Sequence, residues 1–263
     1  MALLEVRGIS KRFGGLLALH RVDLAVESQE ILGLIGPNGS GKTTLFNVIS
    51  GIHRPEEGSI RLDGRHLVGL PPSIICREGI GRTFQIVRPF AKLSVLDNVM
   101  VAALYGQRDG TGLSAARGEA FRWLTFVGLA DRALVQAGSL TLGQRKRLEV
   151  ARALATGPKL LLLDEVMAGL NPTETEQAML LVQRLREQLH LAVIMVEHVM
   201  MAVMGISDRV VVLHHGEKIA EGKPAEVAGN PLVVEAYLGT TEVETANEQK
   251  YRTSLPGETN FRN

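Results

Sequence analysis

The sequence predicts an α/β fold with a parallel β-sheet at its core, and three observations support this prediction. Residues 31–35, 160–163 and 192–196 are apolar throughout, as expected for parallel strands that are buried on both faces. Helical spacing of apolar residues separates these strands along the chain. A glycine-rich segment follows the first strand directly. With 263 residues and a hydrophobic content of 45%, the chain is large enough to bury such a core.

An antiparallel β-subdomain is predicted at the N-terminus. Residues 3–27 alternate loosely between apolar and polar side chains around Gly14-Gly15. Residues 58–68 have the pattern of a hairpin that turns at Asp63-Gly64. These segments therefore differ from the continuously apolar strands of the core.

A helical insertion is predicted in the middle of the chain. Between residues 92 and 155 no strand pattern stands out, whereas residues 95–104, 117–127 and 145–154 have the apolar spacing of helices. We therefore expect a helical subdomain at about residues 88–155, inserted into the α/β core.

The C-terminal half is predicted to complete a β-α-β crossover. Thr173 and Glu176 match the S/T-x-x-E pattern of a capping box, so a helix is expected to begin there and to end before the strand at residues 192–196. From about residue 241 the chain is polar and rich in Glu, Thr and Asn. We expect residues 1–240 to form a single domain and residues 241–263 to form a loose tail.

Composition excludes several classes of function. Lys and Arg total 29 against 28 Asp and Glu, so the chain has no electrostatic bias toward nucleic acid, and no nucleic-acid partner is expected. A single cysteine, Cys76, excludes an intramolecular disulfide and a cysteine-cluster metal site. The N-terminus lacks the pattern of a signal peptide, and the longest apolar runs are far shorter than the ~20 residues that cross a bilayer. We expect a cytoplasmic protein that meets membranes only through partners.

The glycine-rich segment predicts nucleoside triphosphate binding. It fits G-x-x-x-x-G-K-[ST], a loop whose backbone N–H groups curl round an anion. Lys42 reaches the outer phosphates, and the hydroxyl of Thr43 is placed to ligate magnesium. A helix that begins near Thr43 adds its N-terminal dipole. The residues assigned to nucleotide binding here are Gly36, Pro37, Asn38, Gly39, Ser40, Gly41, Lys42, Thr43 and Thr44.

Two carboxylates follow the apolar run at residues 160–163. Asp164 and Glu165 lie where ligands bind in open α/β sheets, at the carboxyl end of a strand. Asp164 is predicted to hold magnesium, directly or through water. Glu165 is predicted to act as general base on a water, or to polarise it.

A third motif lies shortly before these carboxylates, and here the resemblance to a family becomes specific. Residues 140–144 read Leu-Thr-Leu-Gly-Gln and open a helical segment. With the phosphate loop and the carboxylates, this motif resembles the L-S-G-G-Q signature of ATP-binding cassette (ABC) ATPases. In that family the signature caps the phosphates of ATP held by a second subunit, which implies such contacts for Thr141, Gly143 and Gln144. A hydroxyl, a glycine N–H and a helix N-terminus together suit an anion. Leu142 replaces the first glycine of the signature.

Further residues follow the order of the family. Phe13 resembles the aromatic residue that stacks on adenine, Gln85 the glutamine that senses magnesium and links the core to the helical insertion, and His198 the histidine that contacts the γ-phosphate. The resemblance therefore implies Gln85 and His198 as catalytic residues beside Glu165. It also implies Thr43, Gln85 and Asp164 as the magnesium site. Asn171 and Val166 stand where many members have Asp and Pro.

The resemblance covers about residues 3–240 and implies a P-loop NTPase with a RecA-like parallel sheet, an antiparallel β-subdomain and a helical ABC insertion. Residues 12–16, 81–85, 168–172 and 197–200 look like the larger ATPase subunit of branched-chain amino acid importers, as do residues 236–239.

That family uses ATP and Mg²⁺ at the cytoplasmic face of the inner or plasma membrane. The resemblance implies as partners a second ABC ATPase chain, related or identical, two membrane permeases and an extracytoplasmic substrate-binding protein. We expect a permease to dock near residues 87–96, because Phe90, Leu93 and Val95 form an apolar mix there.

Three alternatives stay open at this point. The cargo could be urea, another amino acid, an aromatic acid or a lipid, because the ATPase never touches it. A soluble ABC ATPase acting on DNA or ribosomes shares every nucleotide motif, although such proteins usually bring a second cassette, a coiled coil or a basic arm. A binding module with degraded catalysis would account for Leu142, Val166 and Asn171, but the other motifs argue against it.

Overall fold

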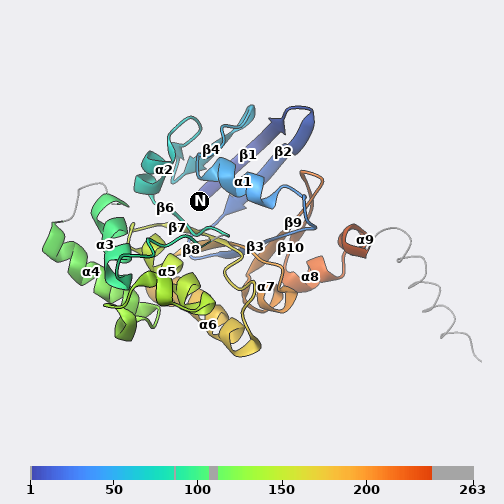
Figure 1. Ribbon diagram of the computed structural model, residues 1–263. Coiled ribbons are helices and arrows are strands. Elements are labelled where there is room, and N and C mark those ends of the chain that lie inside the picture. The colour runs from blue at the N-terminus through green and yellow to red at the C-terminus, as the bar shows by residue number, and fades with distance from the viewer. Residues whose placement is uncertain (1, 86, 107–111, 239–263) are drawn as a thin grey trace, which may run out of the picture.

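The structure is a computed structural model that describes residues 2–85, 87–106 and 112–238 (Figure 1). The predicted tail at residues 241–263 lies outside the described residues. Within the described part, no helix is long and apolar enough to cross a membrane.

A six-stranded sheet forms the core, with strand order β10-β9-β3-β8-β7-β6. Its parallel strands are β3, β6, β7, β8 and β9. Strand β10 runs antiparallel to β9. Their bounds are Ile31–Ile35 for β3, Ile80–Arg82 for β6, Leu160–Asp164 for β7, Ala192–Val196 for β8, Arg209–His214 for β9 and Glu217–Gly222 for β10. The three continuously apolar runs are therefore parallel strands, as predicted, and β6, β9 and β10 are additional.

A second sheet is antiparallel, with strand order β2-β1-β4-β5, and the predicted N-terminal β-subdomain is present. Its strands are β1 (Leu4–Phe13), β2 (Leu16–Val26), β4 (Glu57–Leu62) and β5 (Arg65–His66). The two predicted turns, at Gly14-Gly15 and Asp63-Gly64, join β1 to β2 and β4 to β5. Asp63 adopts the left-handed conformation with φ 51°, which Asp tolerates better than most residues.

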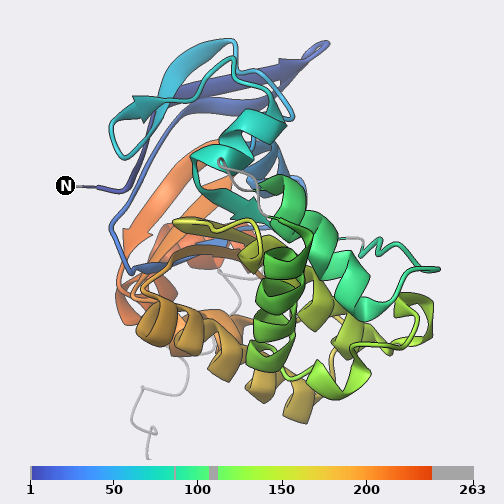
Figure 2. The same ribbon diagram turned by 90° about the vertical axis from the view of Figure 1, so that its left-hand side faces the viewer.

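Helices cover both faces of the central sheet. They are α1 (Lys42–Ile49), α2 (Pro72–Glu78), α3 (Val95–Gly106), α4 (Leu113–Phe126), α5 (Leu142–Leu154), α6 (Pro172–Leu189), α7 (Met200–Ile206), α8 (Pro224–Ala228) and α9 (Pro231–Leu238), with 3-10 turns at Ala130–Arg132 and Ala137–Ser139. The three helices predicted between residues 92 and 155 are α3, α4 and α5, and Figure 2 shows them gathered in green, away from the blue N-terminal sheet.

The central sheet separates two hydrophobic cores. Along β7, Leu161 and Leu163 face a core shared with α3 to α7, whereas Leu160 and Leu162 face a core shared with α1 and the N-terminal sheet. All four side chains are fully buried. This alternation explains why the strand is apolar at every position, since each face of the sheet meets its own core.

The start of α6 differs from the prediction. The capping residue is Asn171 and not Thr173, because the Asn171 side chain accepts a hydrogen bond from the Glu174 backbone N–H and Glu174 returns one to the N–H of Asn171. Pro172 occupies the first helical position, where its missing N–H has no consequence. A capping box with Asn in place of Ser or Thr thus begins the helix two residues earlier.

Candidate nucleotide-binding and catalytic site

The predicted site residues meet at one edge of the central sheet. The phosphate loop follows β3, His198 follows β8, Asp164 and Glu165 end β7, and Gln85 follows β6. These four strands are consecutive neighbours in the sheet and run parallel, so their carboxyl ends lie side by side. Ligands of open α/β sheets bind at such an edge.

The phosphate loop is closely packed against the strands beneath it. A Cβ at Gly36, where φ is 149°, would lie 2.0 Å from the Leu213 carbonyl oxygen, and a Cβ at Gly41, where φ is 105°, would lie 2.7 Å from that of Ala18. Glycine is therefore required at both positions by conformation and by space. The loop leads directly into α1, whose N-terminus adds partial positive charge.

Lys42 is held within this loop. Its ammonium donates to the carbonyl oxygens of Gly36 at 2.7 Å and Pro37 at 2.8 Å, and to the Ser40 hydroxyl at 3.3 Å. Burial lowers the pKa of Lys42, and the nearby charges of Glu165 and Asp164 oppose that effect. The loop thus presents a cation at its centre, suited to the outer phosphates of a nucleotide.

Asp164 is a buried carboxylate with one free oxygen. Its Oδ2 accepts from Arg82 at 3.1 Å, its backbone N–H donates to the Thr83 hydroxyl, and its Oδ1 has no hydrogen-bond partner. Burial raises the pKa of Asp164, and Arg82 counteracts that rise. An orphaned carboxylate oxygen is a ligand that a hard cation such as Mg²⁺ would satisfy.

The three residues assigned to magnesium line one cavity. Thr43, Gln85 and Asp164 contribute a hydroxyl, an amide and a carboxylate to its wall. All three offer oxygen donors, so the residues present fit Mg²⁺, which keeps several waters and binds few protein ligands.

Glu165 lies between the two other predicted catalytic side chains. Gln85 Nε2 donates to Glu165 Oε2 at 2.9 Å, and His198 Nε2 lies 3.0 Å from Glu165 Oε1. The structure therefore brings Gln85, Glu165 and His198 together, from β6, β7 and β8. A carboxylate held in this way can accept a proton from a water that approaches the phosphate loop.

Arg82 is a site residue that sequence reasoning missed. It donates to Asn47 Oδ1 and to the Ser50 hydroxyl, both at 2.8 Å, as well as to Asp164. Its guanidinium lies over the rings of Phe46 and Phe84, and its side chain is only 7% exposed. The available signal was a basic residue within residues 81–85, the segment that carries Gln85.

Glu197 was also missed as a functional neighbour. It is 1% exposed, its Oε1 accepts from the Met167 backbone N–H at 2.7 Å, and its Oε2 has no partner. Burial raises the pKa of Glu197 to about 7. The only signal in the sequence is that Glu197 directly follows the apolar strand β8 and precedes His198.

The signature residues form the N-terminus of α5. Thr141 caps this helix, because its hydroxyl accepts from the Gln144 backbone N–H at 3.3 Å and Gln144 Oε1 accepts from the Thr141 N–H at 3.0 Å. Thr141 and Leu142 are exposed, whereas Gly143 is buried. The helix N-terminus is thus accessible to an anion from outside the chain.

Two further predictions, adenine stacking and permease docking, concern apolar residues. Phe13 is 42% exposed, with its ring edge-on to His53, so it is available for stacking, and its role toward adenine stays a prediction. Phe90 and Leu93 are exposed, but Val95 is fully buried at the start of α3, so its place in the docking surface was wrong. Val95 begins α3 and faces the helical core.

A groove lies next to Phe84, which is 50% exposed. Its wall includes Ile52, Ile75 and Ala102, from the segment after α1, from α2 and from α3. Arg82 and Arg152 line both this groove and the cavity with the magnesium candidates. The groove therefore adjoins the nucleotide site.

Comparison with known proteins identifies the family. A protein-family model described as ABC transporter matches residues 19–168. The chain belongs to this family. As an ABC cassette it is an ATP-binding ATPase of a transporter, with the predicted P-loop NTPase fold. A second model, described as branched-chain amino acid ATP-binding cassette transporter, matches residues 217–243.

Individual ABC cassettes resemble most of the chain. The high-affinity branched-chain amino acid transport ATP-binding protein LivG of Salmonella typhimurium is 44% identical over 249 residues, which cover 90% of this chain and 98% of LivG. The ADP-bound crystal structure of MJ1267, an ATP-binding cassette of an ABC transporter, superimposes with a TM-score of 0.82 at 31% identity and covers 91% of this chain and 99% of its own. The dimeric structure of MJ0796, a bacterial ABC transporter cassette, has a TM-score of 0.77 at 27% identity. The match covers 84% of this chain and 98% of the MJ0796 chain.

Proposed function

We propose that this ABC ATPase energises the import of the branched-chain amino acids leucine, isoleucine and valine. The observation that carries the proposal is the 44% identity to LivG across nearly the full length of both chains. The match of residues 217–243 to a branched-chain amino acid cassette model supports the same cargo.

Hydrolysis is assigned to the residues at the sheet edge. Lys42 leaves its contacts with Gly36 and Pro37 and binds the outer phosphates of ATP, while the loop N–H groups hold them in place. Thr43, Gln85 and Asp164 would hold Mg²⁺, which when bound offsets charge on the β- and γ-phosphate oxygens. These three residues already line one cavity.

Glu165 is assigned as the general base. It orients a water for in-line attack on the γ-phosphate and accepts its proton, with Gln85 and His198 fixing the two carboxylate oxygens before the reaction. His198 turns from Glu165 toward the γ-phosphate when nucleotide binds. Loss of that phosphate after hydrolysis removes a contact made only in the closed state.

Two chains would meet head to tail. Thr141, Gly143 and Gln144 at the start of α5, where Thr141 is exposed and Gly143 is buried, would cap the phosphates bound by the facing cassette. MJ0796 forms a dimer, and a second cassette, two permeases and an extracytoplasmic binding protein complete the proposed assembly on the cytoplasmic side of the membrane. The groove at Phe84 is the proposed contact for a permease, together with the exposed Phe90, whose ring lies against Arg152 of the groove wall.

The experiment that tests the assembly is affinity purification of the chain from detergent-solubilised native membranes, followed by identification of bound chains by mass. Two very apolar subunits and a second ATPase chain are expected. ATPase stimulation by the binding protein loaded with leucine, but not with urea or an aromatic acid, would support the cargo. Recovery with ribosomes or DNA instead would remove the transport proposal.

The ATP chemistry is tested separately. Lys42→Ala removes the phosphate counter-charge and is expected to lose nucleotide binding or turnover, whereas Glu165→Gln should keep binding and lose hydrolysis. A Glu165→Gln variant that hydrolyses ATP at the wild-type rate would contradict the assignment of the base.

A further inference from the structure

Lys146 lies at an unusual place for a lysine. It belongs to the first turns of α5, the helix that begins with the signature residues, yet the residue is only 7% exposed. Its ammonium donates a short hydrogen bond to the backbone carbonyl oxygen of Glu165. The contact joins the helix aimed at a facing cassette to the residue assigned as base in the chain's own site.

The backbone of Glu165 needs such support. Its φ is 51°, in the left-handed region, which is strained by about 1–2 kcal/mol for a residue with a side chain. Its N–H donates to the Val196 carbonyl oxygen of β8 at 2.9 Å, and its carbonyl oxygen accepts from Lys146. Strained backbone of this kind persists only where neighbouring groups hold it on both sides.

Glu197 holds the same loop one step further along. Its Oε1 accepts a hydrogen bond from the Met167 backbone N–H, two residues after Glu165, at 2.7 Å. Lys146 and Glu197 thus hold the chain on either side of Val166. The pair connects α5, the loop after β7 and the end of β8, which carries His198.

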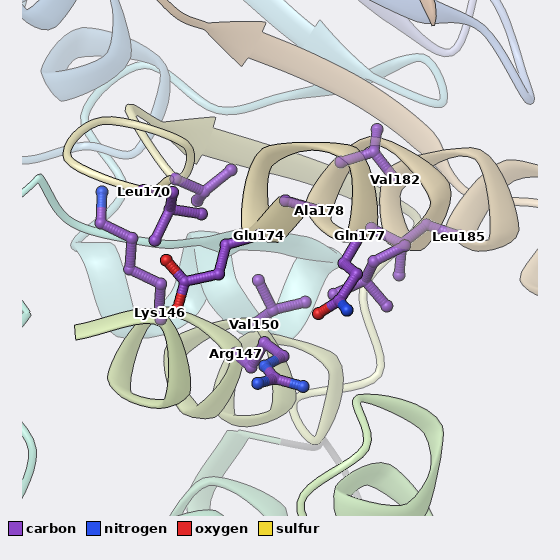
Figure 3. Close-up of a pocket in the computed structure, with 12 residues that line it drawn as sticks. Lys146, Arg147, Val150, Leu170, Glu174, Gln177, Ala178, Val182 and Leu185 are labelled. Atoms are coloured by element: carbon purple, nitrogen blue, oxygen red, sulfur yellow. The ribbon is translucent and has the colours of Figure 1, made fainter. Parts of the chain in front are cut away.

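Helices α5 and α6 also pack against each other through buried apolar side chains. A narrow pocket separates the two helices and is lined mainly by Val150, Ala178, Leu181 and Val182. Figure 3 shows Lys146 extending from α5 past this pocket toward the loop before α6, beside Leu170. Because Lys146 contacts the Glu165 backbone directly, a shift of α5 would act on Glu165 through this hydrogen bond.

We propose that Lys146 is a positioning residue that couples the signature helix of a chain to the general base of the same chain, by holding the Glu165 carbonyl oxygen. When the start of α5 closes on the nucleotide of the facing cassette, the Lys146 contact brings Glu165 into its hydrolytic position. Each chain then hydrolyses its own ATP only when it is also capping its partner's. This inference rests on the proposed role of Glu165.

The test compares Lys146→Met with Lys146→Arg in the full-length chain. Methionine keeps the unbranched stem and removes the donor, and we expect kcat for ATP to fall about tenfold to a hundredfold while KM stays within about twofold, because a displacement of about 1 Å can cost a factor of this size. Lys146→Arg restores a donor and should recover most of the loss. Because the pKa of Glu197 is already about 7, its carboxyl can take up a proton in the methionine variant, so the fold is expected to persist.

Arg145→Met is the matched control. Arg145 precedes Lys146 on the same helix and donates to the Gly138 carbonyl oxygen, away from Glu165. Amide hydrogen exchange should quicken at residues 166–168 in Lys146→Met and stay unchanged there in Arg145→Met.

Two outcomes would overturn the inference. One is a kcat in Lys146→Met within twofold of wild type, in a chain whose Glu165→Gln variant is inactive. The other is an equal loss in Lys146→Met and Arg145→Met, which would indicate general damage to α5. Activity retained in Glu165→Gln would instead contradict the proposed base itself.

Discussion

Replacing Arg82 by methionine should destabilise the nucleotide-free protein strongly. The substitution keeps an unbranched apolar stem between the rings of Phe46 and Phe84 and removes the only charge that contacts the Asp164 carboxylate among the described residues. It also removes the donor for Asn47 and Ser50. The variant therefore removes the charge and the hydrogen bonds of this buried group and keeps its apolar stem.

The size of the effect follows from burial. Side-chain exposure is 7% for Arg82 and 2% for Asp164, and breaking one partner of a buried pair costs about 3–5 kcal/mol. Protonation limits this cost, because neutralising a carboxyl of ordinary pKa at pH 7 requires about 4 kcal/mol. We expect the free energy of unfolding to fall by about 4 kcal/mol. Arg88→Met, at an exposed residue lining the same cavity, should change it by less than about 0.5 kcal/mol.

Urea unfolding at pH 7 measures both variants, without ligand and with ATP and Mg²⁺. Bound Mg²⁺ would supply the counter-charge that Arg82 no longer provides, so the deficit of Arg82→Met should shrink by at least about 1 kcal/mol with Mg²⁺ and ATP and not with ATP and EDTA. A deficit below about 1 kcal/mol without ligand would refute the reasoning from burial. An unchanged deficit with Mg²⁺ would refute the placement of the metal at Asp164.

Three further predictions concern other parts of the molecule. Because the pKa of Glu197 is raised to about 7, this group stabilises the folded state fully below pH 4.5 and loses that contribution as pH rises through about 7. The free energy of unfolding of the wild type, relative to that of Glu197→Gln, should therefore fall by up to about 3 kcal/mol over this pH range. Urea unfolding at several pH values measures the difference. Thr141→Ala loses the cap of α5 and should lower stability by about 1 kcal/mol, leaving the ATP affinity of the single chain unchanged but reducing turnover of the assembly. Phe90→Asp should abolish cargo-stimulated ATPase in proteoliposomes while basal ATPase persists; stimulation at the wild-type level would rule out docking there.

The fold was predictable where local pattern and burial coincide. Strands β3, β7 and β8 are apolar at each position because both faces are covered, and such runs stand out in a sequence. Strand β6 has only three residues, including a glycine, so no periodicity can reveal it. Residues 210–213 of β9 are as apolar as the other strands and could have been found by the same rule.

The site was predictable as far as motifs reach. Glu165 and Lys42 belong to patterns in which spacing itself implies chemistry. Arg82, Lys146 and Glu197 act through contacts between distant segments, and no spacing within the sequence relates Arg82 to Asp164 or Lys146 to Glu165. Arg82 and Glu197 stand beside motif residues in the sequence, but their roles follow only once burial and partners are known.

The order of strands in the central sheet has a consequence for how activity appears during folding. Strand β3 pairs with β8 and β9, and β8 pairs with β7, so the phosphate loop meets His198 through contacts such as Leu34 with Val196, far apart in the sequence. Closing such large loops is slow, whereas α3, α4 and α5 fold largely through neighbours along the chain. A refolding chain should therefore regain its helical signal before it can hold nucleotide, and a ribosome must release nearly the whole chain before the first ATP can bind.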